Sequence, residues 1–253
     1  EEGGDESSSG ECTDFTMSLV EGVVLPPAVV RLAIRLQCDG DPVPDKTEED
    51  FSIAEDGTAV SSFESDFMIV PTVSALRLAT VMLIDMSGSI VDSGSVATLQ
   101  SAALSFIERL GEDQEVAIYL FDGRRDLLLW QSLTTDHEVL AAAVSSLSDY
   151  EVVDASTNLN GAIISSIGIM ESLALSDSDT MIDTSMVVFT DGVDMASYYT
   201  DEEAVAAVEA SDFAFYSVGL GSDLDEEHME AVGREGYFSS SDLDGLEAAF
   251  DEV

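Results

Sequence analysis

The larger, C-terminal part of the chain alternates short apolar runs with segments whose apolar residues recur at helical spacing. Residues 81–84 form a continuous apolar run, as expected for a strand that is buried on both faces of a sheet. Between Val96 and Leu110 the apolar residues lie three or four positions apart, which predicts an amphipathic helix. The alternation continues to the end of the chain. It predicts an α/β fold with a doubly wound, mostly parallel sheet and helices on both faces.

Further elements of both kinds follow along the chain. Thr135 and Glu138 have the spacing of a capping box, which predicts a helix start at that point. Other helices are predicted at residues 159–170, 204–208, 229–232 and 243–250, the last of which closes the chain. The remaining predicted strands are residues 116–121, 127–130, 186–189, 213–218 and 237–238.

The N-terminal part has a different pattern. Residues 1–10 contain only Glu, Gly, Asp and Ser and are expected to be a flexible acidic linker. Residues 11–76 show strand-like runs at 15–20, 29–36, 50–54 and 67–70, with turn signals between them and no helical period. They predict a small all-β, sandwich-like domain. Residues 77–253 are then the α/β domain.

The chain is strongly acidic. Its 52 acidic residues against 8 basic ones give a net charge of −44, and Lys46 is the only lysine. Nucleic acid is a poor partner and an anionic membrane surface is disfavoured, because binding them requires Lys and Arg against phosphate. This charge is typical of an exported protein or of a salty environment, where screening relieves self-repulsion.

Two further features bear on export. No apolar stretch is long enough to span a bilayer, and the polar first residues are expected to be a tether left after a signal peptide, or following a lipid-anchored cysteine upstream. Cys12 and Cys38 are the two cysteines. An even, small number in an exported chain predicts a disulfide between them, and two buried free thiols are the alternative. The expected location is extracellular or at the cell surface.

Two of the predicted buried strands run directly into an aspartate. The first ends at Asp85, and the later one continues through Thr190 into Asp191. In open α/β sheets ligands bind at the carboxyl edge, where the strand order reverses. In the doubly wound order 3-2-1-4-5-6 the first and fourth strands are neighbours at that point. These are the strands that end in Asp85 and Asp191, so we expect the two carboxylates to lie close together.

Hydroxyl groups are expected at the same edge. Ser87 and Ser89 follow Asp85, and Thr157 lies in a polar loop that leads into a predicted helix. With the two carboxylates they would offer only oxygen atoms, which suit a hard cation such as Mg²⁺, Mn²⁺ or Ca²⁺ rather than zinc or copper.

Each of these residues also has an ordinary structural interpretation. Asp85 and Ser87 could cap the following helix, and Thr157 could be a helix N-cap. Asp191 followed by glycine could be a simple turn. The order and spacing of all the elements together favour the metal site.

The pattern Asp85-x-Ser87-x-Ser89, followed by Thr157 and then by strand-Thr-Asp191-Gly, resembles the metal-ion-dependent adhesion site of von Willebrand factor type A domains. The resemblance covers about residues 77–253. It implies that the hydroxyls of the two serines and the threonine contact the metal directly, while the two aspartates act largely through bound water or hydrogen bonds. It also implies an adhesion or binding module that takes an Asp or Glu carboxylate from a protein partner. Residues 50–57 are similar to the β segment that precedes this domain in some exported bacterial proteins.

Two other functions are alternatives. A structural subunit of a surface assembly, with an incidental metal site, is the first alternative. An Asp-dependent phosphatase is the second, but that chemistry favours Asp at the position of Ser87 and a lysine nearby, and Lys46 lies in the other domain. The two histidines, His137 and His228, are expected to be solvated, and no nucleophile elbow occurs. The chain is therefore not expected to be an enzyme.

Overall fold

A computed structural model describes residues 15–25, 29–38, 41–43, 46–55, 57–60, 76–176, 181–220 and 224–239. The chain divides into two compact units, the second of which begins at Leu76. Among the predicted features, the linker at 1–10, the strand at 67–70 and the closing helix at 243–250 lie outside the described residues. Cys12 also lies outside them, so its predicted bond to Cys38 stays a prediction.

The regular elements described in the first unit are five β-strands and one 3-10 turn. An antiparallel hairpin of β1 (Phe15–Leu25) and β2 (Val29–Cys38) is extended by the two-residue strand β3 (Asp41–Pro42). A separate two-stranded sheet consists of β4 (Ala54–Glu55) and β5 (Thr58–Ala59). The strand predicted at 50–54 is wrong except at Ala54, the first residue of β4, because Asp50 ends the 3-10 turn η1 (Glu48–Asp50) and residues 51–53 lie in neither a helix nor a strand. The Asp50 carboxylate accepts a hydrogen bond from the backbone N–H of Thr47.

The β1–β2 hairpin has one apolar side. Phe15, Met17 and Leu19 alternate along β1 and pair with alternate residues of β2, as in any strand with side chains on two faces. A register shift between Leu19 and Glu21 marks a bulge, which bends the strand there. Apolar side chains on this hairpin are exposed, among them Phe15, Met17, Leu19, Val30 and Leu32.

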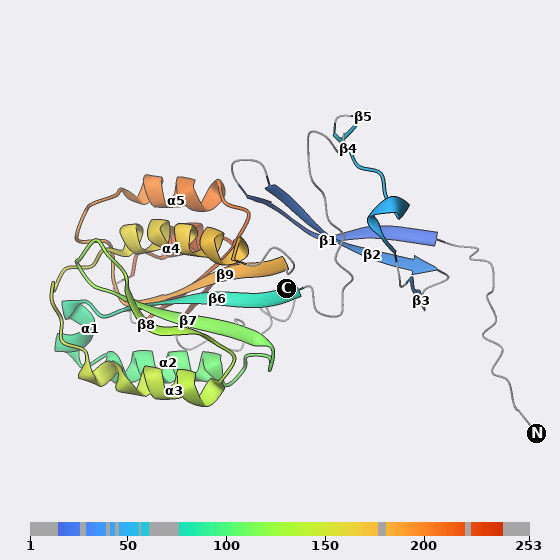
Figure 1. The fold of residues 1–253 in the computed structure, drawn as a ribbon. Helices are drawn as coiled ribbons and strands as arrows, with labels where there is room; N and C mark the ends of the chain where they lie inside the picture. The colour runs from blue at the N-terminus through green and yellow to red at the C-terminus, as the bar shows by residue number, and fades with distance from the viewer. Residues whose placement is uncertain are drawn as a thin grey trace, which may run out of the picture. The chain divides into compact units, whose positions relative to one another are not determined.

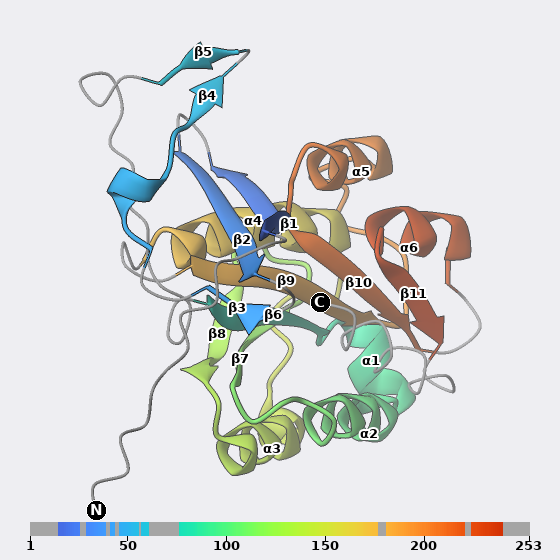
Figure 2. The ribbon, with the colours of Figure 1, turned by 90° about the vertical axis from the view of Figure 1, so that its right-hand side faces the viewer.

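The second unit is a six-stranded sheet in the order β11-β10-β9-β6-β7-β8 (Figure 2). Numbered along the chain within this sheet, the strands have the doubly wound order 3-2-1-4-5-6 that the sequence predicted. All neighbours are parallel except β7 and β8. The strands are β6 (Leu76–Asp85), β7 (Gln114–Phe121), β8 (Leu128–Thr134), β9 (Met181–Thr190), β10 (Ala214–Gly219) and β11 (Gly236–Ser239).

Helices cover both faces of this sheet. In Figure 1, α4 and α5 lie on one side and α1, α2 and α3 on the other, and Figure 2 shows α6 beside α5. The helices are α1 (Gly88–Ser93), α2 (Val96–Ile107), α3 (His137–Ser145), α4 (Leu159–Ala174), α5 (Asp201–Glu209) and α6 (Glu226–Val232), with the 3-10 turn η2 (Ser146–Asp149) after α3. No helix in the described part of the chain is long and apolar enough to cross a membrane.

The central strands are buried on both faces, as their continuous apolar runs predicted. Val81, Met82, Leu83 and Ile84 of β6 are all fully buried. Between α2 and β9 the rings of Phe106 and Phe189 pack edge to face with centroids 6.2 Å apart. Because side chains pack on both faces of the sheet, the central strands are held in place. The residues that follow their carboxyl ends are therefore held in place as well.

One local prediction was wrong, and one helix was not predicted. Thr135 is not the N-cap of α3, because the Asp136 carboxylate accepts hydrogen bonds from the backbone of Glu138 and Val139 and occupies that position. The helix predicted from Val96 is confirmed as α2, but a separate helix, α1, precedes it and was not predicted. Gly94 ends α1 with φ 76°, a left-handed conformation that favours glycine, and α2 starts two residues later.

Candidate functional site

The two predicted strand-end aspartates lie at the point where the strand order reverses. β6 and β9 are neighbours, with Ile84 opposite Phe189, so both strands end at the same edge. Asp85 is the last residue of β6, and Asp191 follows the last residue of β9. Helix α1 begins at this edge (Figure 1). The topology therefore brings together two carboxylates that are more than a hundred residues apart in sequence.

A chain of hydrogen bonds joins four of the five predicted residues. The Ser89 hydroxyl donates to Asp191 Oδ1 over 2.9 Å, and its oxygen lies 3.1 Å from Ser87 Oγ. The backbone N–H of Ser87 donates to Asp85 Oδ1 over 2.9 Å. Two hydroxyls and two carboxylates from the β6–α1 and β9–α5 connections thus form one continuous polar cluster.

Thr157, the fifth residue, is nine-tenths buried or more and lies in the loop before α4. This loop contacts the start of α1, where the Gly88 N–H donates to the carbonyl of Ala155 over 3.0 Å. It also contacts the β9–α5 loop, because the N–H groups of Met195 and Ala196 both donate to the Thr157 carbonyl. The three segments that carry the predicted residues are therefore tied to one another at this edge.

The structure does not favour the helix-capping interpretations. Ser87 occupies the N-cap position of α1, but its side chain makes no capping hydrogen bond. The N-cap position of α4 is Asn158 rather than Thr157, and it has no side-chain cap either. The hydroxyl of Ser87 is directed toward Ser89 instead of toward the helix backbone.

Both carboxylates have raised pKa values. Burial raises the pKa of the fully buried Asp85 to about 6, although hydrogen bonds from Thr190 and Ser87 offset part of the effect, and the nearby charge of Asp191 adds to it. Burial also raises the pKa of Asp191, against the hydrogen bond from Ser89. In the described part of the chain neither carboxylate is paired with Lys or Arg. A buried carboxylate without a positive partner is costly.

Thr190 belongs to the site, although the sequence analysis gave it no role there. Its hydroxyl donates to Asp85 Oδ2 over 2.6 Å and accepts a hydrogen bond from the Gly192 N–H over 3.3 Å. Thr190 is fully buried and links the ends of the two central strands. Its position immediately before the strand-end aspartate was the available signal.

Asp122 was missed as well. It follows β7 and is the third aspartate at a strand end, which is the same signal that identified the other two. Its carboxylate accepts hydrogen bonds from Arg124, from the Tyr150 hydroxyl and from the backbone of Val153 and Asp154. Burial by itself would raise the pKa of Asp122. The hydrogen bonds to its carboxylate have the larger effect and hold the pKa below its ordinary value. Asp122 therefore holds in place the loop that carries Thr157.

Gly88 permits the close approach of this loop to α1. A Cβ atom at Gly88 would lie 2.9 Å from both the Cβ and the carbonyl oxygen of Ala155. We expect Gly88→Ala to destabilise the protein by about 1–3 kcal/mol, because the backbone has to move to relieve the overlap. Gly168→Ala is the matched control: a Cβ there meets nothing within 4 Å, and alanine in a helix gains roughly 0.5–1 kcal/mol. Urea unfolding measures both, and equal stability of the two variants would contradict the close approach.

The expectation that His228 is solvated is wrong. It is buried, and its Nε2 lies 2.8 Å from Asn160 Oδ1 and 3.7 Å from Asp201 Oδ1. Asn160 also donates to Asp201 Oδ1, so this network joins the starts of α4 and α5 to α6. His137 is half-buried at the start of α3, and its Nε2 atom is buried without a hydrogen-bond partner. Neither histidine forms hydrogen bonds with the cluster around Asp85.

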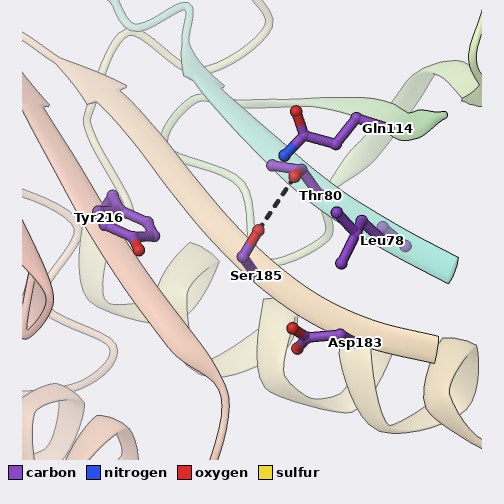
Figure 3. Close-up of a pocket in the computed structure, with 7 residues that line it drawn as sticks. Leu78, Thr80, Gln114, Asp183, Ser185 and Tyr216 are labelled. Carbon is purple, nitrogen blue, oxygen red and sulfur yellow. Dashed lines mark hydrogen bonds between the residues drawn. The ribbon is translucent and has the colours of Figure 1, made fainter. Parts of the chain in front are cut away.

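A small pocket lies elsewhere on the sheet. Figure 3 shows it between residues of β6, β7, β9 and β10, and the Thr80 and Ser185 hydroxyl oxygens are 3.0 Å apart. Thr80 and Ser185 are paired in the sheet five residues before the strand ends that carry the site. The pocket has room for about one water molecule, so it is too small to be a ligand-binding site.

The donor set at the carboxyl edge suits a hard cation. Hydroxyl and carboxylate oxygens are the groups that Mg²⁺, Mn²⁺ and Ca²⁺ prefer. Among the described residues, no group of three or more His, Cys, Asp or Glu side chains is placed to hold a metal. A cation at this edge would therefore depend on hydroxyls as well as on the two carboxylates, and the uncompensated charge of Asp85 fits its presence.

The comparisons with known proteins agree with this fold. The sequence profile of the von Willebrand factor type A domain matches residues 78–237. No curated protein matches the chain.

Solved structures share the fold at low identity. Manganese-loaded TRAP from Plasmodium vivax has a TM-score of 0.57 and 14% identity, over 70% of this chain and 73% of that one. The von Willebrand factor domain of the type V pili tip protein Mfa5 from Porphyromonas gingivalis has a TM-score of 0.50 and 12% identity, over 71% of this chain and 94% of that one. A mussel byssus matrix protein with a zinc-occupied metal-ion-dependent adhesion site has a TM-score of 0.52 and 12% identity, over 70% of this chain but only 46% of its own length.

Proposed function

The chain belongs to the von Willebrand factor type A domain family, and from that premise we propose that its carboxyl-edge cluster binds a divalent cation and, through it, a protein partner. The proposed cation is Mg²⁺, with Mn²⁺ or Ca²⁺ as substitutes. The proposed partner group is an Asp or Glu carboxylate. The residues are Asp85, Ser87, Ser89, Thr157 and Asp191.

The observation that carries this proposal is the environment of Asp85. Its carboxylate is fully buried beside a second carboxylate and has no basic partner in the described part of the chain. A divalent cation at the cluster would neutralise both charges and explain why the fold tolerates them. The hydroxyls of Ser87 and Ser89 lie close to each other and to Asp191, where they would be direct ligands of the cation.

The chemistry of these ligands favours binding over catalysis. Neutral hydroxyls as direct ligands, with the aspartates acting through water or hydrogen bonds, leave the positive charge of the cation incompletely neutralised. Such a cation attracts an external carboxylate. Neither histidine forms hydrogen bonds with the cluster, because His228 bonds to Asn160 and the Nε2 atom of His137 has no hydrogen-bond partner among the described residues. Lys46 pairs with Asp50 in the first unit.

The relatives support the general class of cation and of role. One related structure is loaded with manganese and another holds zinc in its adhesion site, which supports a divalent cation without choosing among them. A third related domain belongs to a pilus tip, which supports adhesion at a cell surface. We propose that this chain is exported and acts extracellularly or at the cell surface, with a lipid anchor upstream as one means of attachment.

The test separates cation binding from partner binding. Calorimetry should show one Mg²⁺ site per chain, and Ser89→Ala should weaken it by about 10-fold or more. Ser101→Ala, an exposed serine on α2, is the control and should bind Mg²⁺ like the wild type. Immobilised peptides with a central glutamate should retain the protein in Mg²⁺ and release it in EDTA, whereas glutamine peptides should not. Mg²⁺ binding without glutamate selectivity would favour a structural subunit with an incidental ion.

A further inference from the structure

Exposed apolar side chains gather on the loops beside the cluster. Among the described residues of the second unit, nine large apolar side chains are exposed, and five of them lie in the loops 150–158 and 191–200. We call these five the apolar rim: Val153, Val193, Met195, Tyr198 and Tyr199. Val153 and Met195 are the most exposed, at 69% and 66%. Single exposed apolar residues are ordinary, but a group on two connected loops marks an interaction surface.

The rim directly adjoins the proposed cation ligands. Val193 follows Asp191 by two residues, and the N–H of Met195 donates to the Thr157 carbonyl over 2.8 Å. On the other loop, the Val153 N–H is bound to the Asp122 carboxylate over 3.3 Å, four residues before Thr157. The two loops that carry the rim therefore also carry, or directly follow, two of the proposed cation ligands.

The backbone of the rim is held in place before any partner arrives. Asp194 accepts hydrogen bonds from the N–H groups of Asn160 and Ser197, over 3.0 and 2.7 Å. Ser197 has φ 54°, a left-handed conformation that costs a non-glycine residue energy and that persists only where its surroundings enforce it. A surface ordered in advance loses less entropy on binding.

The charge near the rim differs from that of the rest of the chain. The guanidinium of Arg125 lies over the Tyr198 ring, 4.0 Å from its centroid, and is exposed. No ion pair of Arg125 occurs among the described residues. The chain as a whole has a net charge of −44, so a highly acidic partner is repelled when it comes within about 10 Å of the surface, on the scale of the screening length in physiological salt, except at the cation itself.

We propose that the apolar rim docks a protein segment in which the acidic residue that reaches the cation is flanked by apolar side chains. This inference rests on the proposed function of the site. The cation and Arg125 provide positive charge for one carboxylate, and the rim provides apolar contact for its neighbours. A run of acidic residues is excluded as the partner segment, because it would gain only one such contact while the chain repels the rest.

The probes are immobilised pentapeptides with a central glutamate and three kinds of flanks: phenylalanine and leucine, serine, or glutamate. In Mg²⁺ we expect binding to the apolar-flanked peptide to be at least about 10-fold tighter than to the serine-flanked one, with the all-acidic peptide no better than the serine-flanked one. Equal binding to all three would overturn the inference, and so would a preference for the acidic flanks.

Variants connect this preference to the rim. Val153→Ser and Met195→Ser should each reduce the preference for apolar flanks several-fold while leaving Mg²⁺ affinity, measured by calorimetry, unchanged. Leu175→Ser is the control, because it removes an exposed apolar side chain, 47% exposed, that follows the last residue of α4 and lies outside the rim. Rim variants that keep the full preference would overturn the inference.

The failure of this inference is distinguishable from that of the proposed function. Glutamate peptides that bind in Mg²⁺ regardless of their flanks would leave the proposed function intact and remove only the role of the rim. Glutamate peptides that bind equally in Mg²⁺ and in EDTA, or not at all, would remove both.

Discussion

Asp85→Asn should make the metal-free protein more stable at pH 7 while weakening its Mg²⁺ binding. Burial raises the pKa of this carboxyl from 3.8 to about 6. Each pKa unit corresponds to about 1.4 kcal/mol, so the ionised carboxylate costs the fold about 3 kcal/mol at neutral pH. Asparagine has nearly the same shape, keeps an oxygen for the Ser87 N–H and carries no charge. We expect a gain in unfolding free energy of up to about 3 kcal/mol, with Mg²⁺ affinity reduced about 10- to 100-fold.

Urea unfolding in EDTA and calorimetry with Mg²⁺ measure the two effects. Asp113→Asn is the charge-matched control, since Asp113 is exposed on the loop before β7. It removes one negative charge without relieving a buried one, so neither quantity should change appreciably. If Asp85→Asn lowered stability in EDTA, the carboxylate would be stabilising the metal-free fold, and the argument from its burial would fail.

The stability of the metal-free protein should also depend on pH in a window set by Asp85. Its pKa is higher in the folded state than in the unfolded state, so its favourable contribution is complete below about pH 4 and is lost as the pH rises through about 6. Asp191 acts in the same direction. Asp122 acts in the opposite direction, since its lowered pKa contributes stability above its ordinary pKa that is lost only in stronger acid.

Saturating Mg²⁺ should remove this loss, because a bound cation stabilises the ionised carboxylates. At about 100 times the dissociation constant, Mg²⁺ should add about 2.7 kcal/mol, which corresponds to a rise in melting temperature of roughly 5–10 °C for a domain of this size. Thermal unfolding from pH 4 to 8, with Mg²⁺ or with EDTA, measures the effect. The many surface carboxylates affect the wild type and Asp85→Asn equally, so the difference between the two profiles isolates this residue. Profiles that run parallel in EDTA would contradict the pKa argument.

The sheet could be predicted from the sequence because its strands are buried on both faces. Continuous apolar runs such as residues 81–84 identify a strand and also place the residue that follows it at the sheet edge. That is why Asp85 and Asp191 could be predicted to lie close together, and the strand order confirmed the adjacency of β6 and β9.

Other parts of the site depend on contacts that no local pattern encodes. The role of Asp122 arises from Arg124 next to it and from Tyr150 across a loop, and the latter contact exists only in the folded chain. The burial of His228 results from the packing of α6 against the starts of α4 and α5, although its acidic sequence neighbours suggested a solvated surface. The cap of α3 was misassigned by one residue, because Thr135 and Asp136 are both good N-caps and tertiary structure decides between them.

The most direct test of the account is a crystal structure of the chain with Mn²⁺, using the anomalous signal to locate the cation. The account predicts one strong peak per chain at the carboxyl edge of the sheet, bound directly by the hydroxyls of Ser87, Ser89 and Thr157, with Asp85 and Asp191 in the shell around it. Manganese found only on surface carboxylates, with no peak between these hydroxyls, would contradict it.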